Sequence, residues 1–228
     1  MSIAVSKKVM PELSPDDIRD ALELDLVLGR LSPRERLVED ELMARFAAKR
    51  HVIRKVLDEL ERAGLVERRP NKGATVRDYA PDEVEELYDL RASLHVLAVD
   101  RFPLPPAPDV VDRLREIADR HEGAVARNDL ANVIRFNDMF HDVLFDLCGN
   151  RFLSQQIHQL GIAANAIRSW RIGDPELLGQ AMREHRAMID AFAIGDRARL
   201  RELVTQHIMP SKKLYFARHG RGQRGAEG

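Results

Sequence analysis

The chain has 228 residues with 44% hydrophobic content and a net charge of −1, which is enough for two modest domains with a buried core. No apolar run approaches the ~20 residues of a membrane-spanning helix, no signal peptide is recognisable, and the single Cys148 cannot form an internal disulfide, so we expect a cytoplasmic protein without a membrane partner. Aromatic content is only 5%, which argues against stacking of single-stranded nucleic acid and leaves double-stranded DNA as the better partner.

The first predicted element is a helix that runs to Leu28. Residues 1–14 are polar and irregular, and Ser14 then serves as an N-cap with Pro15 at the first helical position. Gly29 closes this helix, after which the chain turns toward the next segment.

Two amphipathic helices separated by a short break are predicted between Val38 and Leu60. Their apolar residues recur at spacings of three and four, so the two faces can pack on one another. These residues are Leu42, Phe46, Val52, Ile53, Val56, Leu57 and Leu60. The start of the second helix is basic, with Lys49, Arg50, His51, Arg54 and Lys55 on its polar side. A recognition helix places such side chains in the major groove of DNA.

A basic hairpin follows the second helix. Its strands are Val66–Arg69 and Ala74–Arg77, joined by a turn in which Gly73 supplies the unusual backbone angles, and these are the only strands that we expect. Between Arg45 and Arg77 there are ten Lys or Arg residues and four Asp or Glu, a local balance of +6 in a chain of −1. A cationic head on an acidic body suits a protein whose head neutralises phosphates, although charge alone also fits a solvated helix face.

Four short motifs mark this segment. They are Ser32-Pro33-Arg34-Glu35-Arg36-Leu37, Arg50 to Arg54, Leu60 to Val66, and Pro70 to Val76. Their order and spacing resemble the winged helix-turn-helix of the GntR family of bacterial repressors over residues 15–78. The resemblance implies that operator DNA is contacted by Arg36, Arg50, Arg54, Lys72 and Gly73.

This chain departs from the family pattern in the turn. It has Ala47-Ala48-Lys49 where relatives have Gly-Val-Ser, so we expect a tighter or more helical turn without the glycine. It also lacks the hydroxyl residue after Arg50, a contact to phosphate or base that Lys49 or His51 would replace. We therefore expect this protein to bind an operator sequence that differs from those of its relatives.

After a short linker at 79–81, the chain reads as helical throughout. Period-3.6 patterns predict an all-α bundle of six helices over 82–217. Their approximate ranges are 82–101, 109–127, 129–148, 151–171, 174–194 and 196–217. Pro210 predicts a kink or an early end of the last helix, and the Gly-rich tail 218–228 predicts disorder.

Asn137-Asp138-Met139-Phe140-His141, followed by Gly149-Asn150, is the informative stretch of this body. With later histidines at His185 and His207, it resembles the FCD-type effector domain of the FadR branch of the same family. The resemblance implies a metal site formed by Asn137, His141, His185 and His207.

Asn137 and His141 are four residues apart and share one helix face. Three imidazoles and one oxygen suit zinc, nickel or another borderline divalent ion. The family's first ligand is an aspartate, and a neutral amide at Asn137 is a weaker donor, so we expect lower metal affinity. The remaining histidines are expected to be hydrogen-bonded core or surface residues; they are His95, His121, His158 and His219.

In such regulators the metal helps to hold a small carboxylate effector. Guanidinium groups grip carboxylates in two-pronged fashion, so the candidate effector anchors are Arg91, Arg168 and Arg171. At a position where relatives often carry Glu, this chain has His95, which would alter the pocket or the linker contact.

The sequence thus predicts a mainly α protein that is not an enzyme. It has a winged helix-turn-helix with a two-stranded wing, plus a helical domain for ligand, metal and dimerisation. We expect a homodimeric transcriptional regulator, a repressor released from its operator by a small organic acid. Two alternatives stay open: a metal-dependent hydrolase, for which Glu184 beside His185 would be the base although the HExxH spacing is missing, and a constitutive architectural DNA-binding protein.

Overall fold

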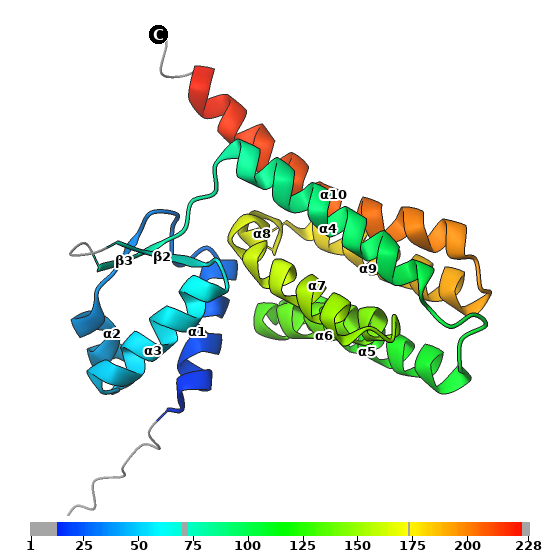
Figure 1. Ribbon diagram of the computed structural model, residues 1–228, viewed down its shortest axis with the longest axis horizontal. Helices are drawn as coiled ribbons and strands as arrows, with labels where there is room; N and C mark the ends of the chain where they lie inside the picture. Colours follow the sequence, from blue (N-terminus) through cyan, green and yellow to red (C-terminus); the bar gives the residue numbers. More distant parts are fainter. Residues whose placement is uncertain (1–12, 70–72, 173, 225–228) are drawn as a thin grey trace, which may run out of the picture.

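The computed structural model describes residues 13–69, 73–172 and 174–224. They form two lobes, a head built from the first three helices and a small sheet, and a larger all-helical body (Figure 1). No helix in these ranges is both long and apolar enough to cross a membrane.

Three helices build the head, α1 (Pro15–Val27), α2 (Glu39–Phe46) and α3 (Arg50–Arg62). Ser14 caps α1 and exchanges hydrogen bonds with Asp17 in a capping box. The apolar faces of the three helices meet in one core, as their periodicity predicts. Its helical members are Ile18, Leu22 and Leu26 of α1, Leu42 and Phe46 of α2, and Ile53, Val56, Leu57 and Leu60 of α3.

The wing is a three-stranded antiparallel sheet in the order β1-β3-β2. Its strands are β1 (Arg36–Leu37), β2 (Val66–Arg69) and β3 (Gly73–Val76). The prediction of only two strands is therefore wrong. The two-residue β1 is too short to show alternation in the sequence, and it exists because Arg36 pairs with Thr75 and Leu37 with Ala74 across the sheet.

The turn between α2 and α3 also differs from its prediction. Ala47 has φ 50° and ψ 34°, the left-handed conformation that glycine adopts without strain. The more helical turn predicted from the missing glycine therefore does not occur. The chain adopts a positive-φ turn and accepts the strain of an alanine there, which costs about 1 kcal/mol.

Seven helices form the body. They are α4 (Pro81–Asp100), α5 (Pro108–Ala126), α6 (Leu130–Asp146), α7 (Arg151–Ala163), α8 (Asn165–Ile172), α9 (Pro175–Ala193) and α10 (Arg197–Arg224). The segment predicted as one helix over 151–171 is divided at Ala164 into α7 and α8. Gly161 lies inside α7, three residues before the break, and no Gly or Pro occupies the break at Ala164 itself, so the local sequence signals did not predict it.

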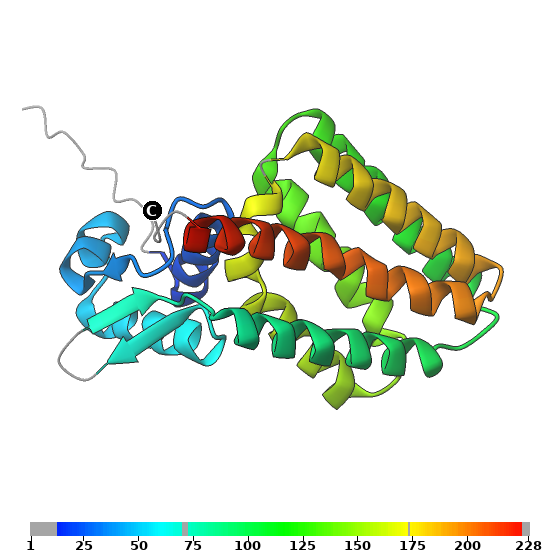
Figure 2. The same cartoon turned by 90° about the horizontal axis from the view of Figure 1, so that it is seen from above.

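Helix α10 is longer than the sequence predicts. It continues through Pro210 to Arg224, so the early end at Pro210 does not occur, and the tail predicted as disordered from Arg218 is helical to Arg224. A proline removes one backbone hydrogen bond, and a glycine costs about 1 kcal/mol in a helix. Packing of α10 along α4, visible in Figure 2, outweighs the loss at Pro210.

The head rests on the body through α8. This helix packs against α1 on one side and against α10 on the other, and Ala166 of α8 contacts the head core. The linker makes a second connection, because the Tyr79 hydroxyl donates a hydrogen bond to the Gly64 carbonyl oxygen at 2.8 Å. The backbone carbonyl of Tyr79 in turn accepts a hydrogen bond from the Tyr215 hydroxyl on α10.

Candidate DNA-binding surface and metal pocket

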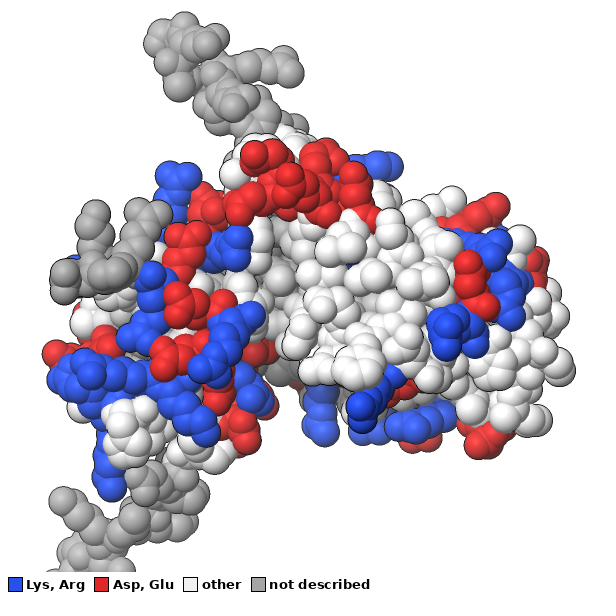
Figure 3. Space-filling view, viewed as in Figure 1, with Lys and Arg blue, Asp and Glu red and all other residues white. Residues whose placement is uncertain are grey.

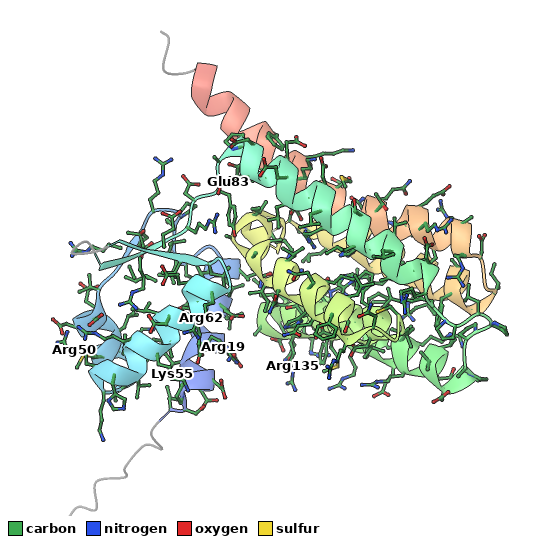
Figure 4. The ribbon with its side chains drawn as sticks, viewed as in Figure 1. Arg19, Arg50, Lys55, Arg62, Glu83 and Arg135 are labelled. Atoms are coloured by element: carbon green, nitrogen blue, oxygen red, sulfur yellow. The ribbon has the colours of Figure 1, made fainter. Side chains whose placement is uncertain are left out.

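The basic face of α3 is exposed at its N-terminal end. Lys49, Arg50, His51 and Arg54 are all exposed, while Ile53 of the same turn is fully buried in the head core. Arg50 lies at the end of the head far from the body, and Arg62 at the other end of α3 lies toward it (Figure 4). Lys and Arg side chains gather over this lobe in Figure 3. The helix thus presents its first turns, as a recognition helix does.

Two acidic residues of α2 hold the arginines of this face. Glu39 Oε2 lies 3.2 Å from Arg50 Nη1 and 3.0 Å from Arg54 Nε, and Asp40 Oδ1 lies 2.5 Å from Arg50 Nη2. Arg50 and Arg54 are about half exposed, so these ion pairs are weak. Their effect is to order the two guanidinium groups while leaving them open to phosphate.

The wing places Arg36 beside Gly73. Gly73 has φ 79°, which confirms that the turn needs a glycine, and the Arg36 Nε lies 3.8 Å from the position that a Cβ on Gly73 would take. Both residues are exposed. Lys72, the other predicted wing contact, lies outside the described residues.

Three histidines from separate helices converge in the body. They are His141 on α6, His185 on α9 and His207 on α10, and their candidate ligand nitrogens lie within 4.8 Å of one another. The His141 and His207 Nε2 atoms are 3.0 Å apart. The ring of His185, which is fully buried, lies 5.2 Å from the ring of His141 and 4.9 Å from that of His207.

The donor set fits a divalent metal ion. Burial, together with the neighbouring His207 and His185, holds the pKa of His141 well below its usual value, so this imidazole is neutral and keeps a lone pair. Two nitrogens that ligate one ion at about 2.1 Å can lie no more than about 4.2 Å apart, and the 3.0 Å between the His141 and His207 Nε2 atoms satisfies this limit. His141 Nδ1 is buried and has no hydrogen-bond partner within the described part of the chain.

Asn137 lies one turn before His141 on the wall of the same cavity. Its Nδ2 donates a hydrogen bond to Asp138 Oδ1 at 3.0 Å, so the amide oxygen is the atom that it would offer to an ion. The predicted role of Asn137 as fourth ligand stays a prediction.

The cavity beside the histidines has a volume of about 340 Å³. Arg91 and Arg168 both line it. Arg168 donates to Asp138 Oδ1 at 3.0 Å and to Asn165 Oδ1 at 2.9 Å. Arg91 is only 6% exposed, its guanidinium lies 5.0 Å from the centre of the Tyr88 ring, and burial lowers its pKa. The side chain of Arg171 lies outside the described residues.

Three further histidines line the cavity, His95, His121 and His158, all of which the sequence predicted as core or surface residues. For His95 the sequence also predicted an effect on the pocket. His121 is 2% exposed, with its ring 5.2 Å from that of His185. His95 is 4% exposed, and burial, with the positive charge of Arg91, lowers its pKa to about 3. Two features of the sequence pointed to His95: it stands where relatives often carry Glu, and its spacing of four from Arg91 puts both residues on one face of α4.

Family comparisons agree with both lobes. The family model described as bacterial regulatory proteins, gntR family, matches residues 15–76, and the FCD domain model matches residues 86–209, more than half of the chain. The chain belongs to the GntR family and carries an FCD domain. It is therefore a DNA-binding transcriptional regulator with a helical FCD domain.

Individual relatives of this GntR/FCD regulator are transcriptional regulators and not enzymes, which removes the hydrolase alternative. The chain is 24% identical to the HTH-type transcriptional regulator YdhC of Bacillus subtilis over 182 residues, 79% of this chain and 80% of the relative. It is 22% identical over 190 residues to the HTH-type transcriptional repressor RspR of Escherichia coli, covering 82% of each chain. The solved structure of Escherichia coli McbR/YncC shares the fold, with a TM-score of 0.73 at 18% identity over 90% of this chain and 98% of that one.

Proposed function

We propose that this GntR/FCD regulator is a metal-dependent, effector-controlled repressor that binds operator DNA as a homodimer in the cytoplasm. One observation carries the proposal: His141, His185 and His207 from three helices converge at a cavity that His141 and His207 line together with Arg91 and Arg168. A constitutive DNA-binding protein has no need of such a cavity.

The proposed DNA contacts come from α3 and the wing of a head spanning about 15–78. Arg36 and Arg50 are exposed cations that neutralise phosphate, and Arg54 lies one turn further along the groove-facing side. The complete proposed set is Arg36, Lys49, Arg50, His51, Arg54, Lys72 and Gly73.

In the body, over about 82–217, the three histidines hold the ion, with Asn137 as a fourth and weaker ligand. Nitrogen ligands favour zinc or nickel. When bound, the ion supplies a fixed positive charge that attracts a carboxylate oxygen of the effector. Arg91 and Arg168, with Arg171 as a third candidate, grip the other oxygens of a small organic acid.

The proposed dimer face lies on α4 and α7, which are adjacent in the body. Leu90 and Leu97 of α4 are 48% and 49% exposed, and Phe152 of α7 is 69% exposed. Leu90 and Leu97 are seven residues apart and so point the same way. Much of the surface over these two helices is uncharged in Figure 3. An apolar patch of this kind suits the partner copy that a two-fold symmetric operator requires.

The signal passes from the cavity to the head through α8, whose Arg168 contacts the cavity and whose Ala166 contacts the head core. Effector and metal stabilise one arrangement of α8 and of the 79–81 linker, and the two heads gain or lose the spacing that the operator needs.

The DNA part is tested by measuring affinity for the promoter of the regulator's own operon at several salt concentrations. Arg50→Ala plus Arg54→Ala is expected to weaken binding and to lower the slope of log affinity against log salt by about 2, since each phosphate contact contributes about 0.9. The matched control is Arg115→Ala on α5, an equally exposed arginine in the body. Unchanged affinity in the double variant would exclude α3 as the reading helix.

The metal part is tested by elemental analysis of protein purified without a His-tag. We expect about one zinc or nickel per chain in the wild type and little in His141→Ala plus His185→Ala. Equal metal content in the two proteins would exclude the site.

A further inference from the structure

Glu184 of α9 lies directly behind one of the cavity histidines. Its Oε2 accepts a hydrogen bond from His207 Nδ1 at 2.6 Å, and its Oε1 accepts one from Gln180 Nε2, also at 2.6 Å. The side chain of His207 is 6% exposed and that of Glu184 is 16% exposed. A hydrogen-bonded chain therefore runs from Gln180 through Glu184 and His207 to His141.

The bond to Glu184 decides which nitrogen of His207 faces the cavity. A carboxylate accepts a hydrogen bond and cannot donate one, so His207 carries its hydrogen on Nδ1. Its Nε2, 3.0 Å from the His141 Nε2, is then left with a lone pair directed at the other histidine.

The charge of Glu184 also matters to an ion in this cavity. The histidines, and Asn137 beside them, are neutral donors. A divalent cation held by them alone would keep its full charge of +2 at a buried site, which is unfavourable. Asp138, the nearby carboxylate on α6, is already engaged by Arg168. Glu184 is the carboxylate that directly contacts a ligand imidazole.

We infer that Glu184 is a positioning residue of the metal site, fixing the tautomer of His207 and supplying the negative charge that the ligands lack, with Gln180 holding Glu184 in place. The inference rests on the metal site proposed above and extends it to Glu184, which the sequence offered only as the base of the hydrolase alternative, and to Gln180, for which neither the sequence motifs nor the comparisons give a role.

The test measures zinc and nickel affinity of the full chain, purified without a tag, by competition with a chromophoric chelator. Glu184→Gln keeps the size and the acceptor oxygen but removes the charge, and it is expected to weaken binding by about tenfold to a hundredfold. Glu184→Asp, which keeps the charge, is expected to bind more tightly than Glu184→Gln. The control is Glu176→Gln on the same helix, where the glutamate is exposed, and its affinity should equal that of the wild type.

A second measurement separates positioning from general stability. Nitrogen-15 NMR of the histidines in the metal-free protein should show hydrogen on Nδ1 of His207 in the wild type and a shift of that tautomer in Glu184→Ala. Gln180→Leu should weaken metal binding by a smaller factor than Glu184→Gln, because the His207 bond remains. Thermal unfolding of each metal-free variant reports whether the fold is retained.

The outcomes are distinct. If the wild type binds metal and Glu184→Gln binds it within about twofold, the role of Glu184 is wrong while the proposed metal site stands. Loss of a residue that orients a metal ligand normally weakens metal binding at least tenfold. If the wild type binds neither zinc nor nickel, the proposed metal site itself is wrong, and the role of Glu184 is overturned with it.

Discussion

The Tyr79 hydroxyl donates a hydrogen bond to the Gly64 carbonyl oxygen, joining the interdomain linker to the end of the recognition helix. The contact is close enough to demand glycine, because a Cβ on Gly64 would lie 2.7 Å from the Tyr79 hydroxyl oxygen and φ at this residue is +77°. Through its own carbonyl, Tyr79 is held by Tyr215 of α10, the helix that also carries His207. Tyr79 thus links the head to the side of the body that carries His207.

Tyr79→Phe should therefore loosen the coupling between body and head. Losing one hydrogen bond lowers the free energy of unfolding by only about 1 kcal/mol, so the protein stays folded. The expected change is in the ratio of operator affinities measured with and without added zinc, which should move toward one. Zinc affinity itself should be unchanged and serves as the internal control. A ratio equal to that of the wild type would show that the signal takes another route.

Ala47→Gly should stabilise the head. Ala47 is exposed and lies at φ 50°, so the substitution removes backbone strain without losing packing. After allowing for the greater freedom of glycine in the unfolded chain, we expect a gain of about 0.5–1 kcal/mol in the free energy of unfolding, measured by chemical denaturation.

The matched control is Ala44→Gly inside α2, another exposed alanine but at a helical position. There the same change should destabilise by up to about 1 kcal/mol. A left-handed turn at Ala47 predicts changes of opposite sign in the free energy of unfolding of the two variants. Equal losses of stability would argue against it.

Arg91→Met should separate stability from effector response. The guanidinium is a buried charge whose Nε has no hydrogen-bond partner within the described part of the chain. Replacing buried charge by an apolar side chain of similar length is often stabilising by about 1 kcal/mol or more. We expect a higher melting temperature, together with loss of the thermal shift that small organic acids produce in the wild type.

The control for Arg91→Met is Arg115→Met at an exposed position on α5, which should leave both measurements unchanged. An organic-acid shift of wild-type size in Arg91→Met would remove Arg91 from the effector site.

Asn137→Asp should increase metal affinity. Asn137 lies one helical turn before His141 on the cavity wall, and a carboxylate is a stronger oxygen donor to a divalent ion than a neutral amide. Chelator competition should show zinc binding tighter by at least about tenfold, which corresponds to about 1.4 kcal/mol. Unchanged affinity would mean that residue 137 does not reach the ion.

Glu23 should make stability depend on pH. Glu23 is a residue of α1 that faces the body, and burial raises its pKa from 4.5 to about 7. The charged groups that face it are Arg19 and Asp20 of α1, Asp138 of α6 and His158 of α7. A carboxylate with a raised pKa binds more protons in the folded state, so its burial lowers stability as pH rises from about 4.5 to about 7.

Glu23→Gln removes this ionisation. Compared with the wild type, its free energy of unfolding should be similar near pH 4.5 and higher above pH 7. Asp16→Asn, at an exposed acidic position of the same helix, is the control. A difference that does not vary with pH would show that Glu23 ionises normally in the folded protein.

The sequence alone determined the local elements of this regulator. Apolar spacing predicted the two helices between Val38 and Leu60 and the helical character of the whole body. Gly73 itself predicted the turn of the wing. Motif order identified His141, His185 and His207 as residues that belong together. These features are legible because a helix face or a tight turn depends on residues within a few positions of one another.

The tertiary structure decided how segments that are far apart in the sequence pack on one another. Strand β1 exists only because β3 lies beside it, and α8 exists as a separate helix between the head and α10. His121 lines the cavity, and Glu184 contacts His207 across 23 positions in the chain, without any local signal. Helical periodicity fixes which side of a helix a residue occupies, but the packing of whole helices decides what that side faces.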